Sequence, residues 1–207
     1  TVSAQSENEA EGAYTVKAMS TATGLGLSVR ETPQAVTVMT RSRMDDQAIT
    51  DISKVIEQSV GVSLNATSAL GSDGVNFYSR GFELKNFQVD GTPRPTSIYG
   101  FSETTSDMAL YERVEIVRGA NGLRSGAGSP AGVVNMIRKR PTTESQASVS
   151  ARVGSWNYNR LEVDAGGKLT PSGNVRGRFV AVHQDSDAFV ERANLEKQLV
   201  YGIAEID

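Results

Sequence analysis

The chain has 207 residues, of which 38% are hydrophobic and 22% charged, with 20 glycines, no cysteine and a formal net charge of −3. This composition excludes a disordered chain, a disulfide scaffold and a thiolate metal site, and the small negative charge gives a nucleic-acid partner no electrostatic support. No run approaches the ~18 apolar residues that a membrane-spanning helix needs.

The N-terminal residues are small, polar and acidic, reading TVSAQSENEAEGA. Such a segment buries too little apolar surface to order itself, so we predict a flexible arm over residues 1–13. A strand is predicted after Pro33, where Val36 and Val38 alternate with other residues.

Residues 42–60 change to helical spacing and predict one helix. Ser42 or Thr50 could cap it, and Gly61 stands where a helix C-terminus favours a positive φ. The residues on its expected apolar face are Met44, Ala48, Ile52, Val55, Ile56 and Val60.

Four further elements, predicted by three segments, complete a small mixed α/β unit over the first 140 residues. FQVDGTP predicts a strand that ends in a tight turn at Asp90. SDMALYERVEIVRG predicts a short helix capped by Ser106, followed by a strand over residues 113–118. GVVNMIRKRP predicts a strand stopped by Pro141.

The pattern changes after Pro141 to segments of about eight to ten residues that alternate apolar with polar side chains. ASVSARVG, YNRLEVDAG, VRGRFVAVHQ and QLVYGIAEID follow one another, with a turn over residues 170–174. Strands of ~9–11 residues with one apolar face suit a membrane β-barrel, but a soluble antiparallel sheet gives the same alternation. The alternation alone leaves both architectures open.

The glycine-rich stretch RGANGLRSGAGSPAGVVN covers residues 118–135. A phosphate-binding P-loop needs Lys and Ser/Thr directly after its last glycine, and a dinucleotide site needs three glycines that open a helix. Neither pattern is present, because the glycines are followed by a β-branched strand. We therefore expect these glycines to serve sharp turns and close packing.

The segment ERVEIVRGANGLRSGAGSPAGVVNMIRKRP resembles the end of the plug domain of TonB-dependent outer-membrane receptors. The likeness extends to ETPQAVTVMT, DISKVIEQSVGVS, YSRGF and VDGTP in the family's order, and it covers residues 14–207. SDMALYERVEIVRGANGL and GSWN resemble the ferric-siderophore receptors of hydroxamate type, such as those for coprogen and ferrioxamine.

This resemblance implies an α+β plug domain over residues 14–141, a small mixed sheet with short helices. Residues 142–207 would be the first four or so antiparallel strands of a transmembrane β-barrel. A plugged barrel of 22 strands requires on the order of several hundred more residues, so the barrel is incomplete here. The protein would bind a ferric siderophore outside the bacterial outer membrane and import it with energy transmitted by TonB.

The resemblance also implies where the siderophore binds. The loop PRPTSIYGF would present an aromatic ring and an arginine to a bulky, often anionic chelate. A second loop follows the VRG segment, and Tyr78 is a weaker candidate that could instead lie within a strand. The expected siderophore-binding residues are Tyr99, Arg94, Ile98, Phe101, Asn121, Leu123, Arg124 and Tyr78.

Two arginines and the N-terminus have further implied roles. Arg80 and Arg118 match the plug arginines that pair with barrel glutamates in the family, although a pair with Glu112 or Glu115 inside the domain is the alternative. Thr1, Val2, Ser3 and Ala4 resemble only the tail of a TonB box, which would bind TonB by adding a strand to its sheet.

No enzymatic chemistry is expected, because paired catalytic carboxylates, a nucleophile elbow and a cysteine nucleophile are missing. The single histidine, His183, is expected at a strand end beside a solvated loop, and not as a metal ligand. Iron would stay in the siderophore, with no other cofactor. The expected partners are the siderophore, TonB and outer-membrane lipid, around a monomer. A different cargo (catecholate, heme or cobalamin), a soluble α/β binding module and a soluble sugar- or nucleotide-acting enzyme remain as alternatives.

Overall fold

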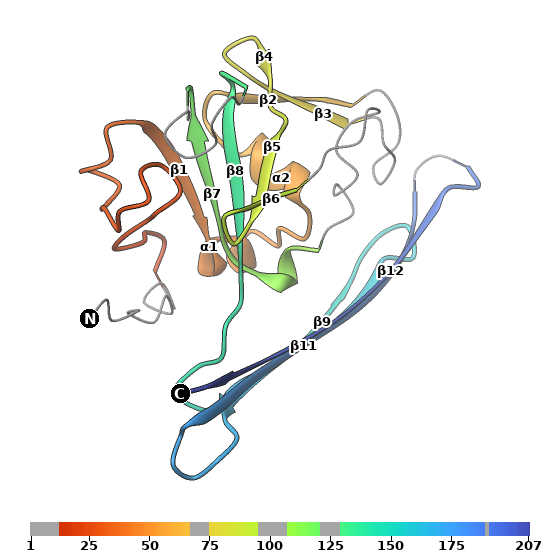
Figure 1. Cartoon of the computed structure of the whole chain (residues 1–207). Helices are drawn as coiled ribbons and strands as arrows, with labels where there is room; N and C mark the ends of the chain where they lie inside the picture. Colours follow the sequence, from red (N-terminus) through yellow and green to blue (C-terminus); the bar gives the residue numbers. More distant parts are fainter. Residues whose placement is uncertain (1–12, 67–74, 95–106, 121–128, 189–190) are drawn as a thin grey trace. The chain divides into compact units, whose positions relative to one another are not determined.

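A computed structural model describes residues 13–66, 75–94, 107–120, 129–188 and 191–207 (Figure 1). The chain divides into two compact units, residues 1–138 and 139–207. Strands predominate in both, and no helix within the described residues is long and apolar enough to cross a membrane.

The first unit is organised around a five-stranded sheet with the order β1-β7-β8-β5-β6. Its strands are β1 (Ala35–Thr40), β7 (Tyr111–Arg118), β8 (Gly132–Arg138), β5 (Asn86–Val89) and β6 (Thr92–Arg94). β5 runs parallel to β8, and the other neighbours are antiparallel. The predicted strands after Pro33 and around Val89 are confirmed. The β5–β6 connection is the expected tight turn, since Asp90 and Gly91 have φ of 50° and 77°.

The predicted single helix over residues 42–60 is wrong. Two short helices occur instead, α1 (Arg41–Asp46) and α2 (Ile52–Glu57), separated at Ala48, whose φ is 51°. Their caps are Thr40 and Asp51, whose side chains accept from Arg43 N and Lys54 N. Two side-chain oxygens that can start a helix thus divide a segment whose apolar spacing looks continuous.

Most of the expected apolar face is buried, but two of its six members are not. Met44, Ile52, Val55 and Ile56 are fully buried, whereas Ala48 and Val60 are exposed. These buried side chains join Phe77, Phe87 and residues of β7 and β8 in the main core on one face of the sheet. A three-stranded sheet, β2 (Val62–Ala66), β3 (Val75–Ser79) and β4 (Phe82–Glu83), also contributes to this core.

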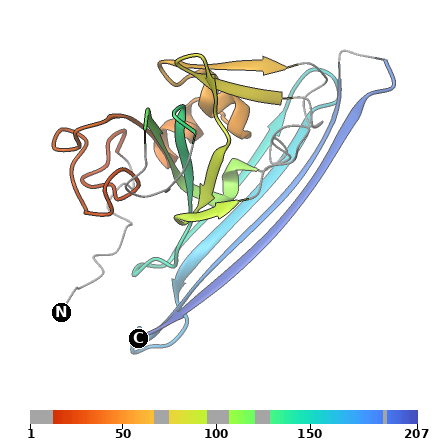
Figure 2. The same ribbon diagram turned by 45° about the horizontal axis from the view of Figure 1, so that its top comes forward.

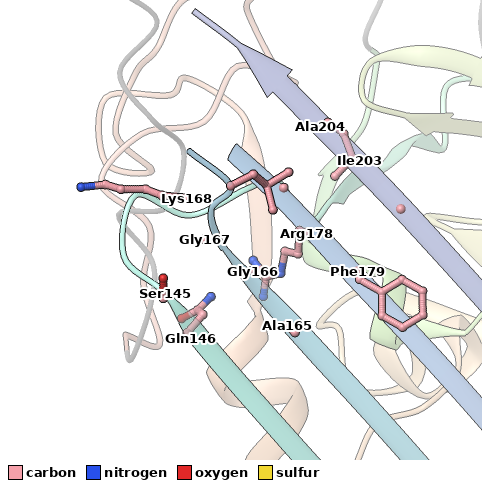
Figure 3. Close-up of a pocket in the computed structure, with 13 residues that line it drawn as sticks. Ser145, Gln146, Ala165, Gly166, Gly167, Lys168, Arg178, Phe179, Ile203 and Ala204 are labelled. Atoms are coloured by element: carbon pink, nitrogen blue, oxygen red, sulfur yellow. The ribbon is translucent and has the colours of Figure 1, made fainter. Parts of the chain in front are cut away.

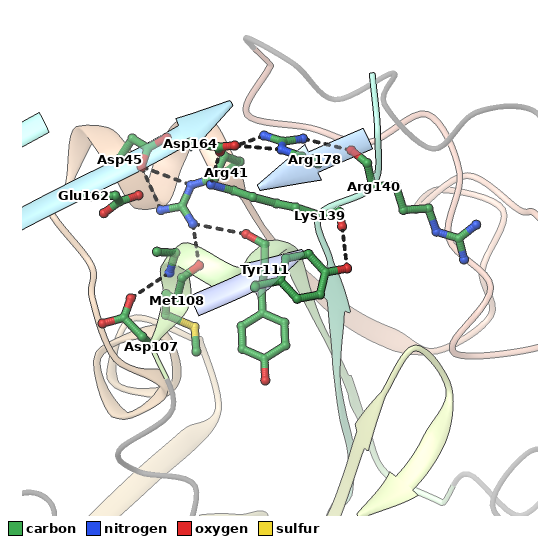
Figure 4. A network of polar contacts seen from close by, with 12 residues as sticks. Arg41, Asp45, Asp107, Met108, Tyr111, Lys139, Arg140, Glu162, Asp164 and Arg178 are labelled. Atoms are coloured by element: carbon green, nitrogen blue, oxygen red, sulfur yellow. Dashed lines mark hydrogen bonds and ion pairs between the residues drawn. The ribbon is translucent and has the colours of Figure 1, made fainter. Parts of the chain in front are cut away.

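The strand β7 begins earlier than predicted and follows a single turn of 3-10 helix, η3 (Met108–Leu110). Asp107 caps this turn by accepting from Ala109 N, whereas the predicted cap, Ser106, lies outside the described residues. Arg41 of α1 donates to the carbonyl oxygens of Met108 and Tyr111 at 2.6 and 3.1 Å, which fastens the start of β7 to α1 (Figure 4).

The opposite face of the five-stranded sheet is covered by the N-terminal part of the unit. Met19 and Ala22 are buried there against Val117 and Val133 in a second, smaller cluster. Tyr14 of the same segment donates a hydrogen bond to the Asp46 carboxylate, which raises the pKa of the tyrosine above its ordinary value.

The second unit is an antiparallel meander of four neighbouring strands, β9 (Gln146–Val153), β10 (Asn159–Lys168), β11 (Val175–Asp187) and β12 (Asn194–Ile206) (Figure 2). The four predicted segments and the turn over residues 170–174 are confirmed. His183 lies within β11, exposed, and not at a strand end as predicted, because β11 continues to Asp187 by pairing with β12.

The register separates an apolar from a polar face on this second sheet. Val149, Val200 and Ile206 are 70%, 76% and 79% exposed on one face, together with Leu161, Phe179 and Leu169. The band from Leu161 to Leu169 measures about 26 Å along a strand at ~3.3 Å per residue. Tilted by ~40°, it would be about 20 Å high, close to the ~25 Å apolar band of membrane barrels.

Candidate functional site

The expected siderophore-binding segments follow strands that finish at the same end of the five-stranded sheet. β5 begins at this end of the sheet, where Asn86 pairs with Val133 of β8, and β6 ends there, where Arg94 pairs with Phe87. β7 also ends there, at Arg118 opposite Gly132. The segment that follows Arg94 and the segment that joins β7 to β8 therefore start at the same end of the sheet, with β5 between β8 and β6.

Most of the residues predicted to bind the siderophore lie outside the described residues. Arg94 is described, and it is exposed at the end of β6. Tyr78 is half-buried within β3, opposite Ser63 and Glu83, so it belongs to the three-stranded sheet. The predicted residues outside the described ranges are Ile98, Tyr99, Phe101, Asn121, Leu123 and Arg124, together with Thr1, Val2, Ser3 and Ala4.

The structure brings the two predicted plug arginines to one place. Arg80 lies in the β3–β4 turn with a φ of 53°, and its Nη1 lies 3.1 Å from where a Cβ on Gly119 would be. Arg118 precedes that glycine, lies over Gly61 and donates to the carbonyl oxygen of Val60. Two glycines thus provide the space in which both guanidinium groups lie.

The alternative partner Glu115 is engaged elsewhere. This fully buried carboxylate accepts from Arg113 Nε at 2.7 Å and from the hydroxyl of Thr21. Arg113 and Glu115 share a face of β7 with Arg113 opposite Thr40 and Glu115 opposite Val38. This ion pair was not predicted; its signal in the sequence is the alternation of charges in ERVEIVR.

A second polar cluster lies on the polar face of the four-stranded sheet. Asp164 of β10 accepts from Lys139 Nζ at 2.6 Å and from Arg178 Nε and Nη2 at 2.9 Å each (Figure 4). Arg178 also donates to the carbonyl oxygen of Arg140, and Tyr201 donates to that of Lys139. These bonds therefore attach residues 139 and 140, which precede β9, to strands β10, β11 and β12.

A hollow of about 630 Å³ lies at the end of the same sheet where β9 begins (Figure 3). Its floor is formed by small residues, among them Gly166, Gly167, Gly177 and Gly202. Arg178 in its wall is already paired with Asp164, and its side chain packs over Gly166. The hollow exists because these glycines have no side chains to fill it, and neither Arg94 nor Tyr78, the predicted binding residues that the structure describes, lines it.

The family model described as "TonB-dependent Receptor Plug Domain" matches residues 28–133. The ferric-pyoverdine BN7/BN8 receptor of Pseudomonas putida is 45% identical over 202 residues, which are 98% of this chain and 24% of that protein. The ferripyoverdine receptor of Pseudomonas aeruginosa is 45% identical over 201 residues, 96% of this chain and 24% of that protein. The chain therefore spans about a quarter of the length of these relatives.

Solved structures agree with the fold. The outer-membrane ferripyoverdine receptor of P. aeruginosa, bound to ferripyoverdine, matches with a TM-score of 0.89 and 44% identity, covering 97% of this chain and 26% of that one. The alcaligin outer-membrane receptor FauA of Bordetella pertussis matches with a TM-score of 0.85 and 40% identity over 98% of this chain and 34% of that one. These relatives are named as receptors, as expected, and not as enzymes.

The expected resemblance to hydroxamate-type receptors, such as those for ferrioxamine, is not confirmed. The ferrioxamine B receptor of Salmonella typhimurium is 27% identical over 171 residues, well below the pyoverdine receptors. The matched plug segment, the strand pattern of both units and the relatives' identity agree. The chain belongs to the TonB-dependent receptors of the outer membrane, and it comprises a plug domain followed by β-barrel strands.

Proposed function

We propose that this chain is the plug-bearing part of a receptor that binds a ferric siderophore and imports it with energy from TonB. The observation that carries the proposal is that the segments after Arg94 and after Arg118 both start at the same end of the five-stranded sheet. Because the sheet fixes where both segments start, the two segments can contact one ligand at the same time.

The chemistry of these segments fits a ferric chelate. The first carries Arg94 and continues into the aromatic residues Tyr99 and Phe101, while the second includes Arg124. Guanidinium groups donate charge-assisted hydrogen bonds to an anionic ligand, and aromatic rings stack on its planar parts. Transport of this kind needs no covalent step, so iron remains bound to the siderophore's own oxygen atoms.

The proposed cargo is a ferric siderophore of the pyoverdine class. Receptors named for ferric pyoverdine share 45% identity with almost the whole chain, which supports this class over the ferrioxamine class. A hydroxamate siderophore such as ferrioxamine B is the second candidate, favoured by the local resemblance of SDMALYERVEIVRGANGL.

The remaining assignments complete the proposal. Residues 14–141 form the plug and residues 142–207 the first barrel strands, whose apolar face contacts outer-membrane lipid around a monomeric receptor. The arm at residues 1–13 carries the TonB contact at Thr1–Ala4 and binds by strand addition. Arg80 and Arg118 hold the plug through carboxylates of barrel strands beyond residue 207.

The test is a fluorescence-quench titration of the complete receptor, extracted in detergent, with ferripyoverdine, ferric alcaligin and ferrioxamine B. We expect saturable binding of ferripyoverdine that weakens about 10-fold or more in Arg94→Ala, since a charge-assisted hydrogen bond contributes about 1.5–3 kcal/mol. Tyr99→Ala should weaken it about 2- to 10-fold through lost stacking.

Phe82→Ala is the control, because Phe82 is an exposed aromatic residue of β4 that is not among the predicted binding residues, so its replacement should leave affinity unchanged. Preferred binding of ferrioxamine B would replace the cargo class but keep the site. Folded receptor that binds none of the three chelates would refute the proposed function. Uptake of radioactive iron by cells with and without TonB then tests the energy source.

A further inference from the structure

The N-terminal part of the first unit contacts the sheet through a loop. Residues 19–27 form a loop that is closed by reciprocal backbone hydrogen bonds between Met19 and Leu27, at 2.8 and 3.2 Å. Only Met19 and Ala22 of this loop enter the small second cluster. We refer to residues 19–27 as the N-terminal loop.

Thr21 fastens the N-terminal loop to the interior. Its hydroxyl donates to Glu115 of β7 and accepts from Asn135 Nδ2 of β8 at 2.8 Å. Thr21, Glu115 and Asn135 are 2%, 0% and 4% exposed, so none of these groups can turn to water for a replacement partner. Because a buried polar group that loses its partner costs free energy, the three side chains hold one another in place.

The other end of Asn135 reaches the β5–β6 hairpin. Its Oδ1 accepts from the backbone N–H of Gly91 at 3.0 Å, in the turn of that hairpin. The adjacent Asp90 accepts from the backbone N–H and Nε of Arg138 at 2.9 and 2.6 Å. β6 is an edge strand of three residues that ends at Arg94, so this turn and the pairing with β5 set where Arg94 lies.

We propose that Thr21 and Asn135 couple the N-terminal loop to the β5–β6 hairpin through one amide side chain. The part that concerns ligand and TonB rests on the proposed function. Loosening the hairpin removes a partner from Asn135 and weakens its bond to Thr21, and release of the loop weakens the hold on Gly91. Thr21 and Asn135 are positioning residues, connecting the segment next to the arm with the strand that leads into the proposed siderophore site.

Coupling of this kind is reciprocal, because each end changes the stability of the other by the same factor. A chain of contacts alone does not demonstrate coupling, so the test perturbs each end and observes the other. The measurement is hydrogen–deuterium exchange of the complete receptor in detergent, read by mass spectrometry in peptides that cover residues 13–27 and 86–94.

The first perturbation is Thr21→Val, which keeps the shape of the side chain and removes the hydroxyl. We expect about 5-fold faster exchange in the hairpin peptide, which contains the Gly91 amide, since one net hydrogen bond corresponds to about that factor. Thr21→Ser retains the hydroxyl and should restore slow exchange. Ser59→Ala is the control, because it removes a buried hydroxyl that donates to Val55 and leaves Thr21 and Asn135 untouched.

The second perturbation starts from the hairpin and keeps the test decisive if Thr21→Val does not fold. Asp90→Asn tolerates the positive φ of this position but loses the charged contact with Arg138. We expect faster exchange in the peptide over residues 13–27. If neither substitution changes exchange at the opposite end, the contacts are only structural and the proposal is overturned.

A ligand arm separates this proposal from the proposed function. Saturating ferripyoverdine should change exchange over residues 13–27 in the unaltered receptor, and Thr21→Val should reduce that change at least 3-fold while affinity stays within 2-fold. Absence of ferripyoverdine binding in the titration would refute the cargo, while the two substitutions would still decide the coupling. If ferripyoverdine binds but does not change exchange over residues 13–27, this would contradict the proposal that ligand binding acts through the coupling.

Discussion

Replacement of Asp164 by Asn should destabilise the four-stranded sheet more than replacement of Glu162 by Gln. The side chains of Asp164, Lys139 and Arg178 are 9%, 4% and 6% exposed, and the carboxylate pairs with both cations. An amide keeps the shape but removes the negative charge that both buried cations contact. Breaking a buried pair by removing one partner costs about 3–5 kcal/mol.

A matched control is present on the same strand and the same face. Glu162 pairs with Arg160 at 3.0 Å, but its side chain is 14% exposed and the pair contains one cation. The Arg160 side chain is 1% exposed but also donates to Gln184 Oε1 at 3.0 Å, so it keeps an acceptor in Glu162→Gln, and we expect a cost of about 1 kcal/mol. The expected difference between the two substitutions is about 2–4 kcal/mol, which exceeds the uncertainty of a denaturation experiment.

The assay is urea denaturation of the complete receptor in lipid vesicles, followed by tryptophan fluorescence. Adding Lys139→Met to Asp164→Asn removes one of the two cations that contact this carboxylate and should recover part of the lost stability, which a double-mutant cycle measures directly. The reasoning is refuted if Asp164→Asn is no more harmful than Glu162→Gln, or if Lys139→Met adds to its effect.

Three further predictions concern the first unit and the turn before β10. Gly132→Ala should lower the stability of the plug by about 2 kcal/mol or more, seen as faster exchange in β7 and β8, because its φ is 127° and a Cβ would clash with the carbonyl oxygen of Val117. Replacing Arg80 and Arg118 together by Ala should change the free energy of unfolding by ~1 kcal/mol or less but raise ion conductance in planar bilayers; unchanged conductance would speak against their proposed role. Asn157→Ala should speed protease cleavage of the β9–β10 turn, because its Nδ2 donates to Asp187 at 2.6 Å and its φ is 52°.

The sequence predicts the strands well because their signals are local. Alternation predicts β9 to β12, and Asp90-Gly91 predicts its own turn through positive φ values. The helix over residues 42–60 fails for the opposite reason. Thr40 and Asp51 each accept a backbone hydrogen bond and start a separate helix, and apolar spacing carries no information about caps.

The buried polar contacts could not be predicted, because each joins residues far apart in the chain. Thr21 meets Asn135 across 114 positions, and Lys139 meets Asp164 across 25. Neither threonine nor asparagine has a pattern that distinguishes a buried network from a surface turn. Register in three dimensions places Glu115 and Asn135 opposite one another, and only then does Thr21 have two partners.

The glycines of residues 118–135 illustrate how a pattern can be correct about packing and silent about its purpose. Gly119 leaves room for the guanidinium group of Arg80, and Gly132 lets β8 approach the backbone of β7. Gly61, far away in the sequence, does the same for Arg118. A side chain at either position beneath an arginine would push that guanidinium outward. These glycines therefore belong to the arginine pair, since the space they leave decides where two positive charges lie at the edge of the plug.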